Sequence, residues 1–372
     1  MKKILFLLSA ILLFQCNLPV NAQQDISDAD IIEGEVIQLE EENPSRILEE
    51  KVEEENALKA RISEYYSFDK GLFKIRINDY FNFDFGAIGS VNWLLNRQAN
   101  DLATFFKFNS ADIVLSGKVN DYIDYKAQVL PHRDISERTI MGDLWVRGKY
   151  NNYTLQVGRM RKPFAHNPTL SSYNLDFIQH SQIGRLFSDH RDTGAKFVAT
   201  YKYADLALGL FSSMQDRPFK FGNNGIEFDT SLTLKPLAKY SHLGDLKLIA
   251  SIATGERDYS YTNYSGFVSY DYKKFGMKSE FISKEASFID EKKANGYYID
   301  GTYYLTDKLQ ALVRFDSFNP DVDKSSHRQN EYVTGLNYYL NGKNTMFSVN
   351  YSFIDGRKDS HRVGLQMRYR TW

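Results

Sequence analysis

Lysine and arginine side chains recur at every second position in several segments of this chain. In the last of these segments, Arg368 and Arg370 alternate with Leu365, Met367 and Tyr369. Ammonium and guanidinium groups held along one face attract anions by charge and donate strong hydrogen bonds to them. The spacing therefore predicts a surface that binds or guides small anions, provided that the backbone brings these positions to a common face.

Alternation with a period of two is typical of β-strands, because successive side chains of a strand point to opposite faces. The first long run, residues 73–85, alternates apolar with polar residues throughout. The pattern recurs in residues 123–129, 195–201, 206–210, 246–252, 309–315, 347–353 and 363–370. Short polar turns join many of these segments, for example residues 151–152, 203–205 and 341–344, whereas residues 162–193 and 316–329 are long connections. With residues 73–85 taken as a single strand, we predict about 16 strands, with short and long connections in alternation.

The N-terminal segment has the features of a secretory signal peptide. Lys2 and Lys3 precede an apolar run over residues 4–14, and small residues at the end of the segment favour cleavage after Ala22. The only cysteine, Cys16, lies within this segment and is not preceded by the small residues of a lipoprotein signal. We therefore predict that residues 1–22 are removed and that the mature chain has no disulfide bond.

The composition leaves two classes of β protein open. The chain has 25 tyrosines, 26 phenylalanines and only 8 prolines, its mean hydropathy is −0.45, and beyond Ala22 it has no apolar stretch of about 20 residues. A soluble sandwich or propeller would bury bulky aliphatic residues between sheets. Here the apolar face mixes Tyr, Ala, Thr and Phe, as a lipid-facing surface does, and the other face is heavily charged. These features favour an all-β fold, a transmembrane antiparallel β-barrel.

Charge divides the predicted mature chain into two parts. Residues 25–64 carry 14 acidic and 4 basic residues, a net charge of −10, so that residues 65–372 carry +7 once Lys2 and Lys3 are counted within the total of −1. We predict an acidic periplasmic arm over residues 23–68, helical and coiled-coil-like or else disordered, and an outer-membrane barrel over residues 69–372. The arm would plug the barrel, gate it, or help barrels to trimerise.

The polar face of the predicted strands gives an inventory of the barrel interior. Its basic residues are Lys74, Arg76, Lys126, Arg147, Lys149, Lys196, Lys202, Lys247, Lys278, Arg314, Arg368 and Arg370. Its acidic residues are Asp84, Asp124, Asp143, Glu280 and Asp316. Many of these charges would pair with one another. The excess of bases still predicts a positive lumen that favours anions over cations.

Two stretches around the long connection resemble the phosphate-selective porin O and P family. Residues 153–179 carry Gly158, Arg159, Arg161, Pro163 and Phe164 at the positions of that family's strand-end motif. Arg191, Asp192 and Gly194 match the element that opens the next hairpin, and residues 314–320 are also similar. The motif has Ala165 where the family has glycine or serine, and residues 109–112 lack the paired arginines of many members.

The resemblance implies a 16-stranded barrel, usually trimeric, with inward-folded loops and basic side chains that guide anions. The loop over residues 163–192 is then the expected constriction element, and its cations are Arg185, Arg191, His180, His190 and His166. The other interpretation is an extracellular loop whose cations bind surface polysaccharide or have no role. Histidine protonation within a constriction would make conductance depend on pH below about 6.5.

Other chemistry finds little support in the sequence. Histidines next to Ser181 and Asp189 are the only local material for hydrolysis, so we predict no catalytic residues and no enzyme. Asp321 and Asp323 do not complete a calcium loop, and we expect no metal and no cofactor. The basic charge is dispersed over strand faces, which argues against nucleic acid as a partner.

The sequence therefore predicts a passive porin in the outer membrane of a Gram-negative bacterium. Its partners would be small anions, including phosphate or other oxyanions, outer-membrane lipid and the barrel assembly machinery, and it would form a homotrimer. The alternative is a non-conducting barrel with a structural or adhesive role, plugged by the acidic arm or by the long loop.

Overall fold

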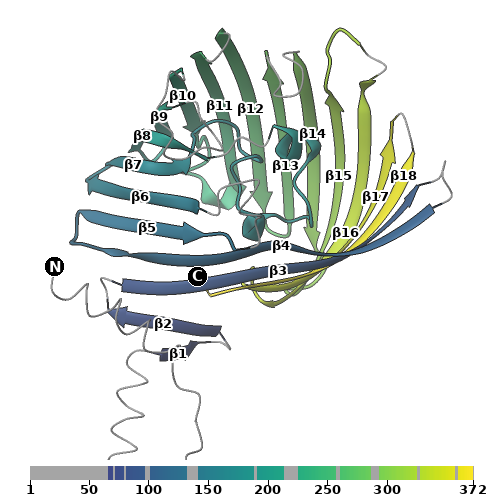
Figure 1. Ribbon diagram of the computed structural model, residues 1–372, viewed down its shortest axis with the longest axis horizontal. Helices are drawn as coiled ribbons and strands as arrows, with labels where there is room; N and C mark the ends of the chain where they lie inside the picture. Colours follow the sequence, from purple (N-terminus) through teal and green to yellow (C-terminus); the bar gives the residue numbers. More distant parts are fainter. Residues whose placement is uncertain are drawn as a thin grey trace, which may run out of the picture. The chain divides into compact units, whose positions relative to one another are not determined.

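The two faces of the alternating segments form the inside and the outside of a closed sheet in the computed structural model. Sixteen strands, β3 to β18, each pair antiparallel with the next, and β18 pairs with β3 to close a barrel (Figure 1). These strands are β3 (Phe81–Asn96), β4 (Asp101–Lys118), β5 (Ile123–Val129), β6 (Met141–Tyr150), β7 (Tyr153–Arg161), β8 (Arg191–Thr200), β9 (Ala204–Phe211), β10 (Glu227–Leu234), β11 (Asp245–Glu256), β12 (Ser260–Tyr272), β13 (Phe275–Lys284), β14 (Ala294–Tyr304), β15 (Leu309–Asn319), β16 (Gln329–Asn341), β17 (Thr345–Asp355) and β18 (Ser360–Arg370). The predicted fold class and strand number are confirmed.

The structure describes residues 66–69, 72–78, 81–96, 101–131, 141–187, 191–212, 225–256, 260–285, 293–324, 327–356 and 359–371. All of them belong to the unit Ala57–Trp372. The predicted signal peptide, the acidic arm up to residue 65 and Trp372 lie outside the described residues. None of the helices in the described ranges is long and apolar enough to cross a membrane.

The first alternating run forms two strands, which corrects the prediction of one. β2 (Leu72–Asn78) ends before β3 begins at Phe81, and the two pair as an antiparallel hairpin. β1 (Tyr66–Asp69) pairs with the other edge of β2. The β2–β3 ladder has a register irregularity between Arg76 and Asn78, so that Ile75 pairs with Phe83 and Arg76 with Asn82, residues of the same parity. Alternation therefore continues from β2 into β3, and parity alone does not reveal where β2 ends. The ring of 16 therefore starts at β3.

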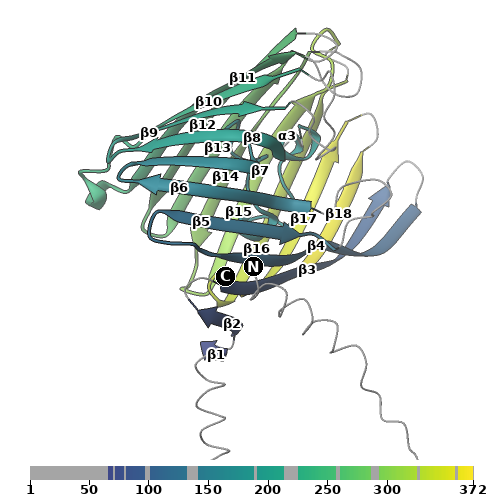
Figure 2. The ribbon, with the colours of Figure 1, turned by 60° about the vertical axis from the view of Figure 1, so that its left-hand side comes forward.

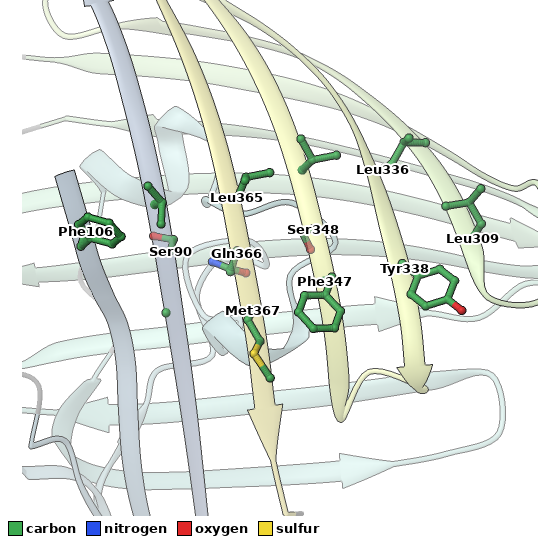
Figure 3. Close-up of a pocket in the computed structure, with 13 residues that line it drawn as sticks. Ser90, Phe106, Leu309, Leu336, Tyr338, Phe347, Ser348, Leu365, Gln366 and Met367 are labelled. Atoms are coloured by element: carbon green, nitrogen blue, oxygen red, sulfur yellow. The ribbon is translucent and has the colours of Figure 1, made fainter. Parts of the chain in front are cut away.

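The alternation separates a polar interior from an apolar exterior, as predicted. On β16 the side chains of Tyr332, Leu336 and Tyr338 are exposed, whereas Glu331 and Asn337 are buried. On the outer face an apolar groove of about 720 Å³ crosses β15 to β18, β3 and β4 (Figure 3). Its exposed lining residues include Leu336, Tyr338, Phe347, Leu365 and Met367. This surface matches the lipid-facing band of a membrane barrel.

The closing seam ends with a local break in alternation. β18 pairs with β3 from Ser360 to Arg370 without a register shift. The next residue, Thr371, is buried although its parity predicts an outward side chain. Its hydroxyl accepts a hydrogen bond from the Phe85 amide at 3.0 Å and donates one to Asp84 Oδ1 at 3.1 Å. The alternation of β18 thus breaks at Thr371, directly after the strand ends.

Adjacent residues of β11 give a matched test of the two faces. Leu248 points outward and Ile249 points inward. An arginine facing hydrocarbon is costly, whereas a lumen-facing one stays hydrated. We expect Leu248→Arg to lower the free energy of unfolding in lipid by about 2 kcal/mol, within the range for lipid-facing arginine, and Ile249→Arg to lower it clearly less. Urea titration of the folded barrel in vesicles measures both, and equal losses would contradict the assignment of faces.

Candidate functional site

The long connection between β7 and β8 folds into the barrel and defines the candidate site. It contains the 3-10 helix η1 (Ser172–Asn174) and the short helix α3 (Gln182–Leu186), which lies within the ring of strands in both views (Figure 2). Ser181 caps α3 by accepting a hydrogen bond from the Gly184 amide at 3.1 Å. The polar interior of the barrel supplies the partners that hold this loop in place.

Gly158 redirects β7 just before the loop begins. Its φ of 127° lies in the region that favours glycine, and a Cβ at this position would come within 2.2 Å of the Leu144 carbonyl oxygen. Before it Leu155 and Val157 face outward, and after it Arg159 and Met160 are both buried. The loop therefore leaves the wall toward the interior.

Carboxylates of the wall accept the backbone amides of the loop. Glu280 on β13 accepts hydrogen bonds from the amides of His166 and Asn167, the second at 2.8 Å. Asp316 on β15 accepts one from the amide of Gln182, at the start of α3, at 2.5 Å. Both carboxylates are buried. These carboxylates supply the hydrogen-bond acceptors that the buried loop amides would otherwise lack.

A single loop carboxylate, Asp176, anchors the middle of the connection. It forms ion pairs with Lys278 on β13 and with Lys343 in the turn between β16 and β17, the latter at 2.9 Å. Burial alone would raise its pKa, but the two lysines hold the pKa of the Asp176 carboxyl well below its usual range. Asp176 thus remains charged and is paired with two cations, Lys278, which the sequence predicts to line the lumen, and Lys343.

Three wall arginines bind the loop backbone or its side chains instead of facing open water. Arg368 donates to the carbonyl oxygens of Tyr173 and Leu175 at 3.0 and 2.8 Å. Arg314 is paired with Asp300 through two bonds at 2.6 and 2.8 Å, and it also donates to a loop carbonyl. Arg370 donates to loop and turn asparagines. These arginines hold the loop against β14 to β18.

Apolar packing completes this half of the interior. Phe164, Ile183 and Phe187 of the loop join a buried cluster with Ile282 and Tyr298 of the wall. The Arg314 guanidinium lies over the ring of Phe177, with its Cζ 4.0 Å from the ring centroid. The cavity left between this part of the loop and strands β15 to β18 has a volume of only about 20 Å³. That is space for about one water molecule.

The wall formed by β5 to β8 is more open and more basic. Lys126 and Arg191 share Asp143, at 2.8 and 2.6 Å, and Arg147 and Lys149 share Asp124, at 2.7 and 2.5 Å. The side chains of Lys126, Arg147 and Lys149 are 28, 32 and 42 % exposed. Lys196 donates to the Arg161 carbonyl oxygen at 3.1 Å. Asp124 and Asp143 are thus each shared by two cations.

Charge is distributed unequally between two sets of strands, a distinction that the predicted excess of bases did not make. Strands β5 to β8 carry seven basic and three acidic residues. Strands β10 to β18 carry seven basic and ten acidic residues. Among the interior acids of the second set are Glu227, Asp300 and Glu331, which the sequence inventory missed. Each lies within a strand, Glu227 on β10, Asp300 on β14 and Glu331 on β16, in a segment that was not among the predicted alternating ones.

The predicted site residues fall into several groups. Arg185 joins Arg362 at Glu331, and Lys247 pairs with Asp245 at 2.6 Å. Lys74 and Arg76 lie on β2, outside the ring, and their side chains are outside the described residues, as is His190. Lys202 lies in an exposed turn and not on the inner wall. The lining role of the remaining residues stays a prediction.

The two described loop histidines are buried and not available as neutral-pH switches, which corrects the expected pH dependence. Burial, followed by nearby Lys278, lowers the pKa of His166 to about 4, and its ring stacks on Phe267 at 3.9 Å. Burial, followed by nearby Arg161, lowers the pKa of His180 to about 3. Nδ1 of His180 lies 3.0 Å from the Asn167 carbonyl oxygen and donates to it.

These pKa values predict a conductance that is constant from pH 8 to pH 5. In the unfolded chain both histidines gain a proton near pH 6.5, whereas the folded chain keeps them neutral until about pH 4 and 3. The free energy of unfolding therefore falls as the pH drops below 6.5. His180→Gln should reduce this fall in a series of melting temperatures from pH 7 to 4, with His242→Gln in an exposed turn as the control. A pH slope unchanged in His180→Gln would contradict the assignment.

Comparison with known proteins agrees with this geometry. Residues 238–369 match the sequence model of the family described as phosphate-selective porin O and P. The resemblance stated above is confirmed over this part, which includes residues 314–320 but not the motif at Gly158. Among curated proteins, none matches this sequence.

Solved porins share the fold. An anion-selective porin from Comamonas acidovorans has 10% identity and a TM-score of 0.58, covering 78% of this chain and 99% of that one. OprB from Pseudomonas putida has 10% identity and a TM-score of 0.60, covering 78% and 94%. OmpF from Salmonella typhi, in complex with daunomycin, has 13% identity and a TM-score of 0.60, covering 82% and 100%. At these identities the likeness shows the barrel fold, and the family match over residues 238–369 supports an outer-membrane porin.

Proposed function

We propose that this outer-membrane porin lets small anions diffuse along the β5 to β8 wall of its lumen. The observation that carries the proposal is the unequal distribution of charge. On β13 to β18, Lys278 binds Asp176, Arg314 and Arg368 bind loop carbonyl groups, and Arg362 binds Glu331. Strands β5 to β8, in contrast, have seven basic residues for three acidic ones. A positive wall in a narrow channel concentrates anions and repels cations.

Permeation requires no bond to be made or broken. An anion that enters from the short-turn end would meet Lys149 and Arg147 first and then Lys126, which are partly exposed. Each of these cations shares its carboxylate with a second cation, so that each group of two cations and one carboxylate keeps a net positive charge that attracts a passing anion. Short-lived, charge-assisted hydrogen bonds would replace part of the hydration of the anion.

The substrate class is small inorganic anions, with phosphate and other oxyanions included. Paired donors spaced along one wall suit an oxyanion, which accepts several hydrogen bonds at once. The neighbour from Comamonas acidovorans is described as anion-selective, and the matched family is described as phosphate-selective, which supports the class. Assembly as a homotrimer and insertion by the barrel assembly machinery remain part of the proposal.

Solute uptake into liposomes tests the proposal. Vesicles with the purified full-length protein should take up phosphate or chloride several times faster than a cation or a neutral sugar of similar size, relative to protein-free vesicles. Uptake in the order of size alone would contradict anion selectivity while leaving a general porin. No uptake of any solute would contradict both.

A second function is favoured by the dense anchoring of the loop. Wall carboxylates, three arginines and an apolar cluster hold the loop in the interior, and the remaining cavity against β15 to β18 holds one water molecule. The alternative is therefore a closed barrel with a structural or adhesive role. Uptake assays on the protein with a shortened loop separate this alternative from an intrinsically open porin.

A further inference from the structure

Three neighbouring turns at one end of the barrel share an unusual surface. They join β8 to β9 (residues 201–203), β10 to β11 (residues 235–244) and β12 to β13 (residues 273–274). The strands from β8 to β13 are consecutive neighbours in the sheet, so these turns lie along one arc of the rim. The first and third are short turns of three and two residues, which in outer-membrane barrels face the periplasm, and the second lies between them on the same rim.

Each turn of this arc places a lysine over a tyrosine ring. Lys202 Nζ lies 5.4 Å from the ring centroid of Tyr203, and Lys239 Nζ lies 5.9 Å from that of Tyr240. In the third turn Lys273 Nζ lies 5.0 Å from the ring centroid of Tyr272. A cation over an aromatic face is attracted by the ring quadrupole and keeps its other donors free. The three ammonium groups are therefore oriented and remain exposed.

The arc is positively charged, and its tyrosines are exposed. Asp205, the acid nearest the first turn, is paired with Lys235 at 2.7 Å, which leaves Lys202 without that partner. Lys274 adds a further exposed cation. The side chains of Tyr203, Tyr240 and Tyr272 are 49, 48 and 37 % exposed. Exposed tyrosines at the end of a lipid-facing band mark the boundary between hydrocarbon and headgroups.

The geometry points to a binding site for anionic phospholipid headgroups, formed by Lys202, Lys239 and Lys273 with their tyrosine rings. The rings lie at headgroup depth, and each lysine extends from that depth toward water, where a lipid phosphate lies. The interaction is with the periplasmic leaflet and does not depend on ion permeation. Charge complementarity favours phosphatidylglycerol over a zwitterionic lipid.

Native mass spectrometry of the full-length protein in mixed micelles tests this site. We expect phosphatidylglycerol to bind the wild type more tightly than phosphatidylcholine. The triple variant Lys202→Gln, Lys239→Gln, Lys273→Gln should lose this preference by about tenfold or more, since each lysine near an anionic lipid contributes roughly a fivefold factor. The triple Lys→Arg variant should retain it.

Lys324→Gln is the matched control. This lysine is 58 % exposed and lies in the connection between β15 and β16, at the opposite end of the barrel. Its loss should leave phosphatidylglycerol binding unchanged. Two results would overturn the site: equal binding of both lipids by the wild type, or an unchanged preference in the triple Lys→Gln variant. The first result would favour an acidic protein as the partner of the arc.

Discussion

Shortening the loop between β7 and β8 should raise the single-channel conductance several-fold. Replacing residues 166–186 by a short glycine-serine linker removes the segment that fills the interior against β10 to β18. The wall itself is closed by the β18 to β3 ladder and does not depend on the loop for its backbone pairing. Conductance of the purified variant in planar bilayers measures the effect, with circular dichroism to verify the barrel.

A matched pair of single substitutions separates the anchoring of the loop from a general loss of stability. Asp176→Asn keeps the shape of the side chain but removes the charge that holds Lys278 and Lys343. Asp205→Asn makes the same change at an ion pair with Lys235 on the rim. We expect a higher or noisier conductance in Asp176→Asn and no change in Asp205→Asn. Unchanged conductance in both the shortened-loop and Asp176→Asn proteins would contradict a constricting loop.

Reversing charge on the β5 to β8 wall should shift the channel from anion toward cation selectivity. The double variant Arg147→Glu, Lys149→Glu places two carboxylates beside Asp124, which these cations now share. The change in wall charge is −4, the same size as the present excess of seven bases over three acids. Anions would then lose their favourable potential along the proposed path. The permeability ratio in a salt gradient gives the result.

Lys247 offers a close control for Lys149. Each side chain is 42 % exposed and paired with an aspartate, at 2.6 Å for Lys247 and 2.5 Å for Lys149. Lys247 lies on β11, on the half of the barrel that the loop covers. Lys149→Glu should therefore shift the permeability ratio more than Lys247→Glu. Equal shifts would place the path along both walls and contradict a path confined to β5 to β8.

The barrel was predictable from the sequence because each strand contacts lipid with one face and the aqueous interior with the other. Val363 and Leu365 face outward and Gln366 and Arg368 face inward, as parity requires. The same rule failed at the first run, since the register irregularity between β2 and β3 pairs residues of the same parity and so preserves alternation. It also failed at Lys202, where the strand ends and the chain turns. Parity identifies a face but does not identify where a strand stops.

The contacts of the loop were not predictable, because they join residues far apart in the sequence. Arg314 and Arg368 have inward parity, which is also the parity of a residue that lines water. Only the fold shows that Arg368 donates to the carbonyl groups of Tyr173 and Leu175. No pattern in the sequence distinguishes Asp176, because it is a single acidic residue within a loop. The distinction between anchoring and lining cations depends on three-dimensional contacts.

The reversal potential of the wild-type protein in a planar bilayer under a potassium chloride gradient tests the central claim most directly. We predict a value close to the chloride equilibrium potential, because the positive charge of β5 to β8 excludes potassium. Addition of phosphate should then reduce the chloride current if both ions share the same path. A potential close to the potassium equilibrium value, or no current above that of the protein-free bilayer, would contradict the account.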